Sequence, residues 1–374
     1  EIHERLVGSE MCIRDRFIRR AVTRVFGVWS RISTQVVRQW DWYPRVEPYV
    51  GYGTGDYSRL ICRTVYAPRH AQSGELIRGI RGMLAIPAPR THVQASIDDM
   101  PLNTVQIGVS EVYDKVDRTR DLGSEYAISD SAGYLDLVAE HRLVPGIHRV
   151  SYSVANRKPV SANLYTIPAS AKVGIISDVD DTIMITQAPV PWKAAYNLLF
   201  LDPKKKASVP GMSVLFTRIA DLFPGAPFFY LSTSPWNVES SIRNFITDHG
   251  FPEGPLLLRD LDPRPKTFVP TGPQHKLEFA EQLMADFPDM KFILVGDDGQ
   301  KDPTTYATIA RRYPGRVLAI VIRELSPRES TGLASVTGLT STQPTPVTDV
   351  PVFTGTTGSN ILKTMLPYLK TVLR

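Results

Sequence analysis

The sequence predicts an α/β fold, with a doubly wound parallel sheet in the second half of the chain and an antiparallel β-sandwich-like region before it. From residue 173 onward, short apolar runs without polar alternation are separated by segments with helical periodicity. This is the pattern of strands that are buried on both faces of a parallel sheet. Before residue 170, apolar and polar residues alternate with a period of two, as in antiparallel strands with one buried face.

The composition is that of a globular protein with more than one domain. The chain has 374 residues, 43% hydrophobic and 22% charged, which is enough for two or three separate cores. Two cysteines, Cys12 and Cys62, exclude a disulfide framework or a cysteine-rich metal site. No apolar stretch approaches the roughly 18 residues of a membrane-spanning helix, and no secretory signal is recognisable, so a cytoplasmic location is expected.

The first 45 residues divide into two parts. Residues 1–16 have no starting Met and no clear periodicity, and we expect them to be a non-native leader. Residues 17–45 are predicted to form a basic amphipathic helix, because apolar side chains recur at steps of three and four. This apolar stripe comprises Ile18, Val22, Val25, Trp29, Ile32 and Val36.

The positive charge of the chain is concentrated in the same segment. Phe17–Trp40 contains five arginines and no acid, which equals the whole formal net charge of +5. Because the remainder is balanced, a protein that coats nucleic acid is not expected. The helix can lie in an anionic membrane interface. It can equally dock on its own domain or on a second copy with its arginines in solvent.

Residues 46–170 are predicted to form the β-sandwich-like domain. Alternating runs are separated by the turn signals "DSAG" and "LVPG", a spacing typical of short antiparallel strands. The runs contain Val93–Ile97, Val105–Val109, Leu135–Leu137 and Val150–Val154. The glycine-rich "YVGYGTGD" has no following Lys-Ser/Thr, so we interpret it as a loop and not as a phosphate-binding loop.

Residues 171–374 are predicted to form the α/β domain, with a flexible loop at 326–348. The predicted strands are Val173–Ser177, Phe228–Leu231, Phe292–Val295 and Val317–Ile322. One helix is predicted to start at Ser234 as N-cap and to end before Gly250, another spans Lys276–Phe287, and Asp302 is predicted to cap a third. A last strand and helix are expected in "DVPVF" and "SNILKTMLPYLKTVLR", where Pro367 would kink or limit the helix.

Polar residues that suit phosphate chemistry follow the ends of these strands or begin the next helix. Asp178, Asp180, Ser232, Thr233, Asp297 and Asp302 follow strand ends, and Lys276 is predicted at the start of a helix. Because the carboxyl ends of parallel strands form one crevice, these residues are expected to converge. Carboxylate oxygens suit Mg²⁺, and a lysine supplies a positive charge to a phosphate. A carboxylate can attack phosphorus to form an aspartyl-phosphate, and a second carboxyl two residues away can serve as acid and base.

The motifs "SDVDDTI", "FYLSTSPWN", "LLLRD", "HK" and "VGDDGQKDPTTY" resemble those of the haloacid dehalogenase superfamily of phosphohydrolases. In particular they are similar to its phosphatidate-phosphatase branch, the actin-patch-associated type with bacterial relatives. "PYVGYGT" and the β-rich region also resemble that branch, so the resemblance covers roughly residues 46–325. It implies a haloacid-dehalogenase-like domain with a small cap and an Mg²⁺ cofactor.

The resemblance also implies a role for individual residues. Asp178 would be nucleophile and Mg²⁺ ligand, and Asp180 would be the acid/base, with its backbone carbonyl on the metal. Ser232 and Lys276 would hold the phosphoryl group. The remaining expected roles are metal ligand for Asp297, supporting acid for Asp302, and substrate contact for Thr233 and Arg259. Thr233 and Ser234 remain alternatives to Ser232, and Asp298 to Asp297, while Thr182 is expected to stabilise the loop.

The substrate is predicted from the segment between the first two motifs. Ile183–Pro227 is too short for a large cap, so the site is expected to be open to a lipid surface or a polymer. Within it, "PVPWKAAYNLLFLDPKKK" can enter an anionic membrane interface or form a small lid on the core. The first hypothesis is hydrolysis of phosphatidate at a membrane reached by peripheral binding. The alternatives are a phosphatase for a soluble or polymeric ester, and a membrane-binding scaffold with a decayed site.

Overall fold

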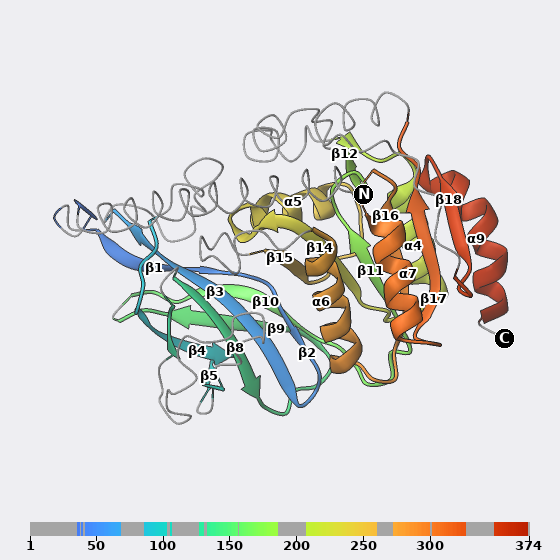
Figure 1. Ribbon diagram of the computed structural model, residues 1–374. Coiled ribbons are helices and arrows are strands. Elements are labelled where there is room, and N and C mark those ends of the chain that lie inside the picture. Colours follow the sequence, from blue (N-terminus) through green and yellow to red (C-terminus); the bar gives the residue numbers. More distant parts are fainter. Residues whose placement is uncertain are drawn as a thin grey trace, which may run out of the picture.

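The computed structural model describes residues 36–37, 39, 42–68, 86–102, 105–106, 127–130, 133–155, 157–185, 207–259, 272–299, 301–326 and 348–372. These residues form a ten-stranded sheet, a six-stranded sheet and a two-stranded ribbon. Figure 1 shows the larger sheet beside the six-stranded sheet, on the side of its edge strand β15 (Leu256–Arg259). The α/β class is confirmed.

The six-stranded sheet is parallel throughout and runs in the order β15-β14-β11-β16-β17-β18. Its other strands are β14 (Phe228–Pro235), β11 (Val173–Asp178), β16 (Lys291–Asp297), β17 (Val317–Arg323) and β18 (Val352–Gly355). The four strands predicted from unbroken apolar runs are all present, as is the last one, while the short edge strand β15 was not predicted. Since all strands are parallel, their carboxyl ends share one edge.

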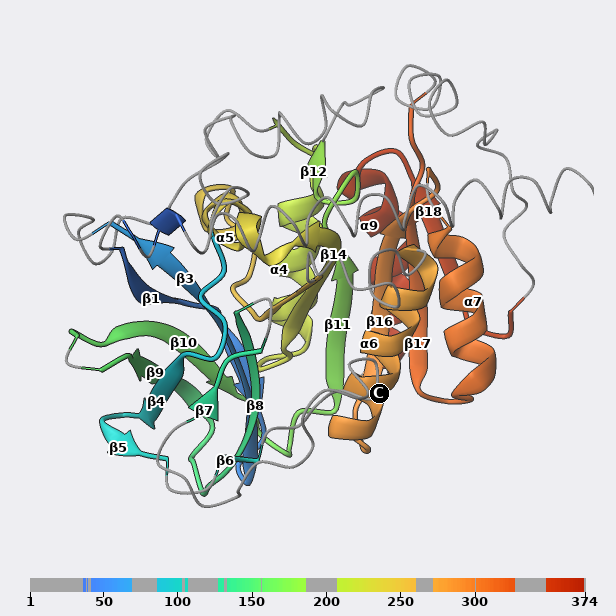
Figure 2. The ribbon, with the colours of Figure 1, turned by 60° about the vertical axis from the view of Figure 1, so that its left-hand side comes forward.

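Helices cover both faces of this sheet, which explains why its strands are apolar throughout. One face packs against α4 (Met212–Leu222), α5 (Glu239–Asp248) and α9 (Gly358–Val372). The other packs against α6 (Gly272–Asp286) and α7 (Asp302–Arg312), which lie on the same side in Figures 1 and 2. The further assignment to a haloacid-dehalogenase-like arrangement stays a prediction.

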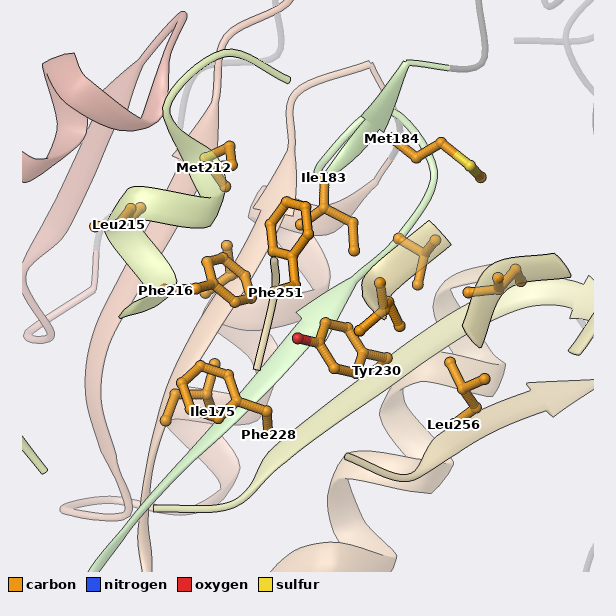
Figure 3. Close-up of a cluster of buried hydrophobic side chains, with 14 of the residues drawn as sticks. Ile175, Ile183, Met184, Met212, Leu215, Phe216, Phe228, Tyr230, Phe251 and Leu256 are labelled. Atoms are coloured by element: carbon orange, nitrogen blue, oxygen red, sulfur yellow. The ribbon is translucent and has the colours of Figure 1, made fainter. Parts of the chain in front are cut away.

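Helix α4 illustrates how the packing fixes an element. Its buried residue Ile219 lies four positions after Leu215 and three after Phe216, and residues at these spacings share one face of a helix. In Figure 3, Phe216 lies beside Phe251 in the cluster that also contains Phe228 and Tyr230, and Leu215 belongs to the same cluster. The rings of Phe216 and Phe228 are stacked with centroids 5.6 Å apart. This helix comes from the segment between the first two motifs, so part of that segment belongs to the core.

The ten-stranded sheet contains the predicted alternating strands. Its longer strands are β1 (Tyr43–Pro48), β3 (Tyr57–Ala67), β4 (His92–Ile97), β8 (Tyr134–Glu140), β9 (Gly146–Ser153) and β10 (Val160–Thr166). The shorter ones are β2 (Gly51–Gly53), β5 (Met100–Pro101), β6 (Val105–Gln106) and β7 (Ala127–Ile128). All pairings are antiparallel except β10 with β2. Alternate residues such as Leu137 and Tyr152 form its core. Hydrogen bonds connect these strands in one sheet, and the two-sheet sandwich stays a prediction.

Three predicted helix starts are wrong. Ser234 and Pro235 extend β14, and a 3₁₀ turn, η3 (Trp236–Val238), precedes α5, because the Ser234 hydroxyl binds Asp180 and does not cap a helix. Helix α6 begins at Gly272, so Lys276 lies in its second turn and not at its start. Helix α7 begins at Asp302 without a side-chain cap, because the Asp302 carboxylate binds Lys276 instead.

The predicted C-terminal strand and helix are confirmed as β18 and α9, but Pro367 does not limit the helix, which continues to Val372. All of the predicted leader, most of the basic helix and most of the flexible loop lie outside the described residues, as does 186–206. Of the helix predicted over 17–45, residues 36, 37 and 39 are helical, but its predicted end is wrong, because Tyr43–Pro48 form strand β1, which pairs with β3. The predicted domain boundaries stay predictions. No helix among the described residues is long and apolar enough to cross a membrane.

Candidate active site

Asp178 is the last residue of the central strand β11, where the chain turns sharply into the next loop. Its side chain is buried, with 1% of the residue exposed. The turn is tight because Asp181 adopts a left-handed φ of 55° and its N–H donates to the Met184 carbonyl. This brings the Thr182 hydroxyl to 3.2 Å from the Asp178 carboxylate, to which it donates. The contact agrees with the loop-stabilising role expected for Thr182.

Lys276 brings together carboxylates from two elements. Its Nζ lies 2.9 Å from Oδ1 of Asp178 and 2.5 Å from Oδ1 of Asp302, and only 1% of the residue is exposed. The other oxygen of Asp302 accepts the Asp297 N–H at 3.4 Å. Asp297 in turn accepts the Gly299 N–H at 2.7 Å. The carboxylates of Asp178 and Asp302, from β11 and α7, therefore contact one buried ammonium, and Asp297 of β16 is linked to them through Asp302.

The electrostatics of this cluster are dominated by burial. Burial, opposed by the Lys276 charge, raises the pKa of Asp178 to about 7. The pKa of Asp297 is also raised, by burial and by the neighbouring carboxylates. The pKa of Lys276 is raised because Asp178 and Asp302 stabilise its charged form more than burial disfavours it. With one ammonium among three buried carboxyls, ionisation of all three would leave an excess of negative charge, which is why the pKa values of Asp178 and Asp297 are raised.

These residues fit a divalent cation. Asp178, Asp297 and Asp302 each offer a carboxylate oxygen, and these oxygens lie within 4.8 Å of one another. All three are buried, and an all-oxygen donor set with few protein ligands suits Mg²⁺ better than a softer metal. Asp180 is not part of this carboxylate group, and the metal role implied for its backbone carbonyl stays a prediction.

Asp180 has a separate set of partners, which come from the end of β14. Its Oδ2 accepts hydrogen bonds from the hydroxyls of Ser232 at 2.8 Å and Ser234 at 3.3 Å. The Ser234 N–H donates to the Ser232 hydroxyl oxygen at 2.9 Å. Ser232 is thus brought to the site as predicted, but its hydroxyl donates to Asp180. Thr233, between these two serines, is half-buried, and its contact with substrate stays a prediction.

The two other sequence candidates lie at the same edge of the sheet. Arg259 is the last residue of β15 and pairs with Pro235, so it follows the strand end next to the serines. Asp298 is half-buried, and its carboxylate accepts the Leu325 N–H at 2.8 Å. Because Asp298 is outside the carboxylate cluster, Asp297 is the better candidate ligand of the two.

Two residues that sequence reasoning missed support the acidic loops. Arg323, the last residue of β17, pairs with Asp297 and donates to the Asp181 carbonyl at 2.8 Å, so it connects both loops. Gly296 precedes Asp297, and a Cβ there would overlap the Asp302 carboxylate and the Tyr306 ring. The sequence features that could have indicated these two residues are the arginine at the end of the apolar run "VLAIVIR" and the glycine directly before Asp297.

Comparison with known proteins bears on this same region. Residues 173–324 match the family described as "Phosphatidate phosphatase APP1, catalytic domain". Residues 173–324 are therefore similar to that catalytic domain. The match begins with β11 and ends just after β17, so it contains Asp178, Lys276 and Asp297.

Two curated relatives extend the comparison. The chain is 29% identical over 211 residues to Phosphatidate phosphatase APP1 of Saccharomyces cerevisiae, covering 54% of this chain and 35% of the relative. It is 26% identical over 176 residues to the uncharacterized protein C29B5.04c of Schizosaccharomyces pombe, covering 46% and 29%. The chain therefore spans about a third of the length of these relatives. A solved structure of PhoD aligns with a TM-score of 0.27 at 9% identity, over 74% of this chain and 70% of that one, which is too low to indicate a common fold.

Proposed function

We propose that this protein is a Mg²⁺-dependent phosphatase that hydrolyses phosphatidate to diacylglycerol and phosphate through an aspartyl-phosphate. The observation that carries the proposal is Asp178, a buried carboxylate at a strand end 2.9 Å from the Lys276 ammonium. It lies within the segment that matches the APP1 catalytic domain. The choice of phosphatidate is supported by the name of that family and of the yeast relative.

In the first proposed step, the Asp178 carboxylate attacks phosphorus. A bond forms between Asp178 and phosphorus, and the bond from phosphorus to the glycerol oxygen breaks. Protonated Asp180 gives its proton to the departing alkoxide. Since Ser232 and Ser234 both donate to Oδ2 of Asp180, the transferred proton would be held on Oδ1. The serine hydroxyls thus fix the orientation of the acid.

In the second step, the deprotonated Asp180 removes a proton from water, which attacks the phosphorus of the aspartyl-phosphate. The bond between phosphorus and Asp178 breaks, releasing phosphate and restoring the carboxylate. Lys276 would neutralise phosphoryl charge in both steps. Mg²⁺, held by Asp178, Asp297 and Asp302 and the Asp180 carbonyl, would supply further neutralisation of the phosphate oxygens.

The proposed setting is the cytoplasmic face of a membrane, reached by peripheral binding. The basic segment Phe17–Trp40 supports it, although nearly all of that segment lies outside the described residues. A soluble or polymeric phosphate ester is the second candidate, since the same residues would act on any phosphate monoester. A scaffold without activity is the third, but the complete set of Asp178, Asp180, Lys276 and Asp297 disfavours it.

The deciding experiment measures phosphate release from phosphatidate in mixed micelles, with a short soluble phosphate ester assayed alongside. We expect turnover of the lipid that needs Mg²⁺, is lost in a chelator and is lost in Asp178→Asn. Turnover of the soluble ester alone would keep the mechanism and refute the lipid substrate. Absence of phosphate release from both substrates would favour the scaffold.

A further inference from the structure

The segment between β1 and β2 connects the ten-stranded sheet with the core of the parallel sheet. Tyr49 follows β1, yet it belongs to the hydrophobic cluster formed by α4, α5, α9 and one face of the parallel sheet. It is buried, with 3% exposed. Gly51 continues the chain where a Cβ would overlap the Arg59 carbonyl, so this close approach of the backbone requires glycine. The prediction of a loop for "YVGYG" is therefore wrong, because Gly51–Gly53 form strand β2 and Tyr49 packs into the core.

Tyr49 packs directly on the residue that follows the candidate site strand. Its ring is stacked on the Trp236 ring, with centroids 4.8 Å apart and an interplanar angle of 23°. Trp236 is itself buried and begins the 3₁₀ turn after β14. Only Pro235 separates it from Ser234, one of the two serines that hold Asp180.

The serine segment of β14 lacks the ladder pairing that fixes the rest of the strand. Pairing with β11 ends at Leu231, opposite Asp178. On the other side, β15 pairs with Leu231 and then with Pro235, and the register shifts between them. Ser232, Thr233 and Ser234 therefore project out of the regular sheet, as residues of a bulge do. Their position depends on how firmly the two flanking residues are anchored.

We infer that Tyr49 is a positioning residue for the phosphatase site: by stacking on Trp236 it fixes the downstream end of Ser232–Ser234, and through these serines the orientation of Asp180. This inference rests on the proposed function. It gives the ten-stranded sheet a role in catalysis without contact to the substrate. Loss of the stack would leave the serines free to move and Asp180 misoriented, which lowers the rate of the chemical step.

The contribution of Tyr49 comes from its ring and not from its hydroxyl. Among the described residues, the buried hydroxyl has no hydrogen-bond partner. Burial raises its pKa, so it is no proton donor for the reaction. Phenylalanine would therefore replace tyrosine, whereas leucine would fill most of the space without the stacked geometry.

Tyr52 offers a matched control from the same segment. It is also buried at the junction, but on the opposite face of the parallel sheet, where it packs edge-on against Phe229 with centroids 5.7 Å apart. Its hydroxyl donates to Asp286 at 3.0 Å and accepts from Gln282 at 2.7 Å. Phe229 lies in the part of β14 that is paired with β11. Tyr52→Leu thus damages the junction without releasing the serines.

The test compares Tyr49→Leu, Tyr49→Phe and Tyr52→Leu in the full chain, at a temperature where thermal denaturation shows each to be folded. We expect kcat for phosphatidate in mixed micelles to fall at least tenfold in Tyr49→Leu, with KM within twofold. Tyr49→Phe and Tyr52→Leu should keep kcat within threefold. Independently of activity, hydrogen exchange at 232–236, where Ser232, Thr233, Ser234 and Trp236 carry an amide hydrogen, should rise in Tyr49→Leu and not in the other two.

Each alternative outcome has a distinct meaning. Equal loss of kcat in Tyr49→Leu and Tyr52→Leu, or unchanged exchange at 232–236 in Tyr49→Leu, would overturn the positioning role. Unimpaired kcat in Tyr49→Leu would also overturn it. If the wild-type protein releases no phosphate, the proposed function fails, while hydrogen exchange still tests the anchoring. Should Tyr49→Leu not fold, Trp236→Phe tests the stack from its other side by the same measurements.

Discussion

Removing the buried charge of Lys276 provides the sharpest test of the acid cluster. In Lys276→Met the stem is replaced by a side chain of similar length, but the ammonium between Asp178 and Asp302 is lost. The buried carboxylates of Asp178 and Asp302 then lose the ammonium between them, while the carboxylate of Asp297 lies within 4.8 Å of both. We expect the metal-free protein to be strongly destabilised, because removing one partner of a buried ion pair among like charges is unfavourable.

The magnitude follows from the geometry. At an effective dielectric constant of about 20, unit charges at the 2.9 Å separation of Lys276 and Asp178 attract by about 6 kcal/mol. Folding of the variant no longer requires the ammonium to be desolvated, so part of the lost attraction energy is offset. Removal of one partner from a buried ion pair typically costs about 3–5 kcal/mol. For a folded unit of roughly 150–250 residues, each kcal/mol of lost stability lowers Tm by roughly 2–4 °C. The Tm should therefore fall by about 6–20 °C.

The assay is thermal denaturation in the presence of a chelator, with and without a second substitution. Lys291→Met, which changes an exposed lysine at the start of β16, is the matched control and should leave Tm within about 2 °C. Adding Asp178→Asn to Lys276→Met should recover part of the loss, because it removes one of the repelling carboxylates. An unchanged Tm in Lys276→Met, or a further fall in the double variant, would refute the account of the cluster as an excess of buried negative charge.

Two further substitutions test the surroundings of the site. Burial raises the pKa of Glu239 to about 7 despite its ion pair with Arg243. The folded state therefore binds this proton more tightly than the unfolded state does. As a result, the stability of the wild-type protein falls as the pH rises from about 4.5 to about 7. Glu239→Gln should therefore gain up to about 3 kcal/mol over wild type between pH 4 and pH 8; an equal difference at both values in urea denaturation would contradict this. Gly296→Ala should displace Asp302 and lower stability by about 1–3 kcal/mol together with phosphatase activity; unchanged stability and turnover would show that the site relaxes without loss.

The positions of the acids could be predicted because each follows a long apolar run. A parallel sheet needs no information beyond these runs to bring Asp178 and Asp297 to one edge. The contacts between their side chains could not be predicted. Whether Lys276 reaches Asp302 depends on where α6 begins, and Gly272 carries no capping signal there.

The error at Ser234 has a physical cause of the same kind. Serine before proline fits the start of a helix by its local chemistry. In the structure the same hydroxyl donates to Asp180, 54 positions earlier in the sequence. A local rule counts only neighbours along the chain, so it assigns the hydroxyl to the nearest backbone. At a strand end that faces a carboxylate, the tertiary partner wins, and the helix begins later at Glu239.

The structural unit around the site is larger than the segment that matches the family. Residues 173–324 exclude β18 and α9, yet Ile361, Met365 and Leu369 of α9 are fully buried in the core that also contains Ile175 and Leu215. The matched segment also excludes the tyrosines before residue 173 that pack on the two faces of the parallel sheet. Since apolar surface buried on this scale is costly to expose, the matched segment contains the candidate site but does not define the limits of the folded body. The strand-end serines illustrate the difference, because their downstream anchor is stacked on a residue outside the matched segment.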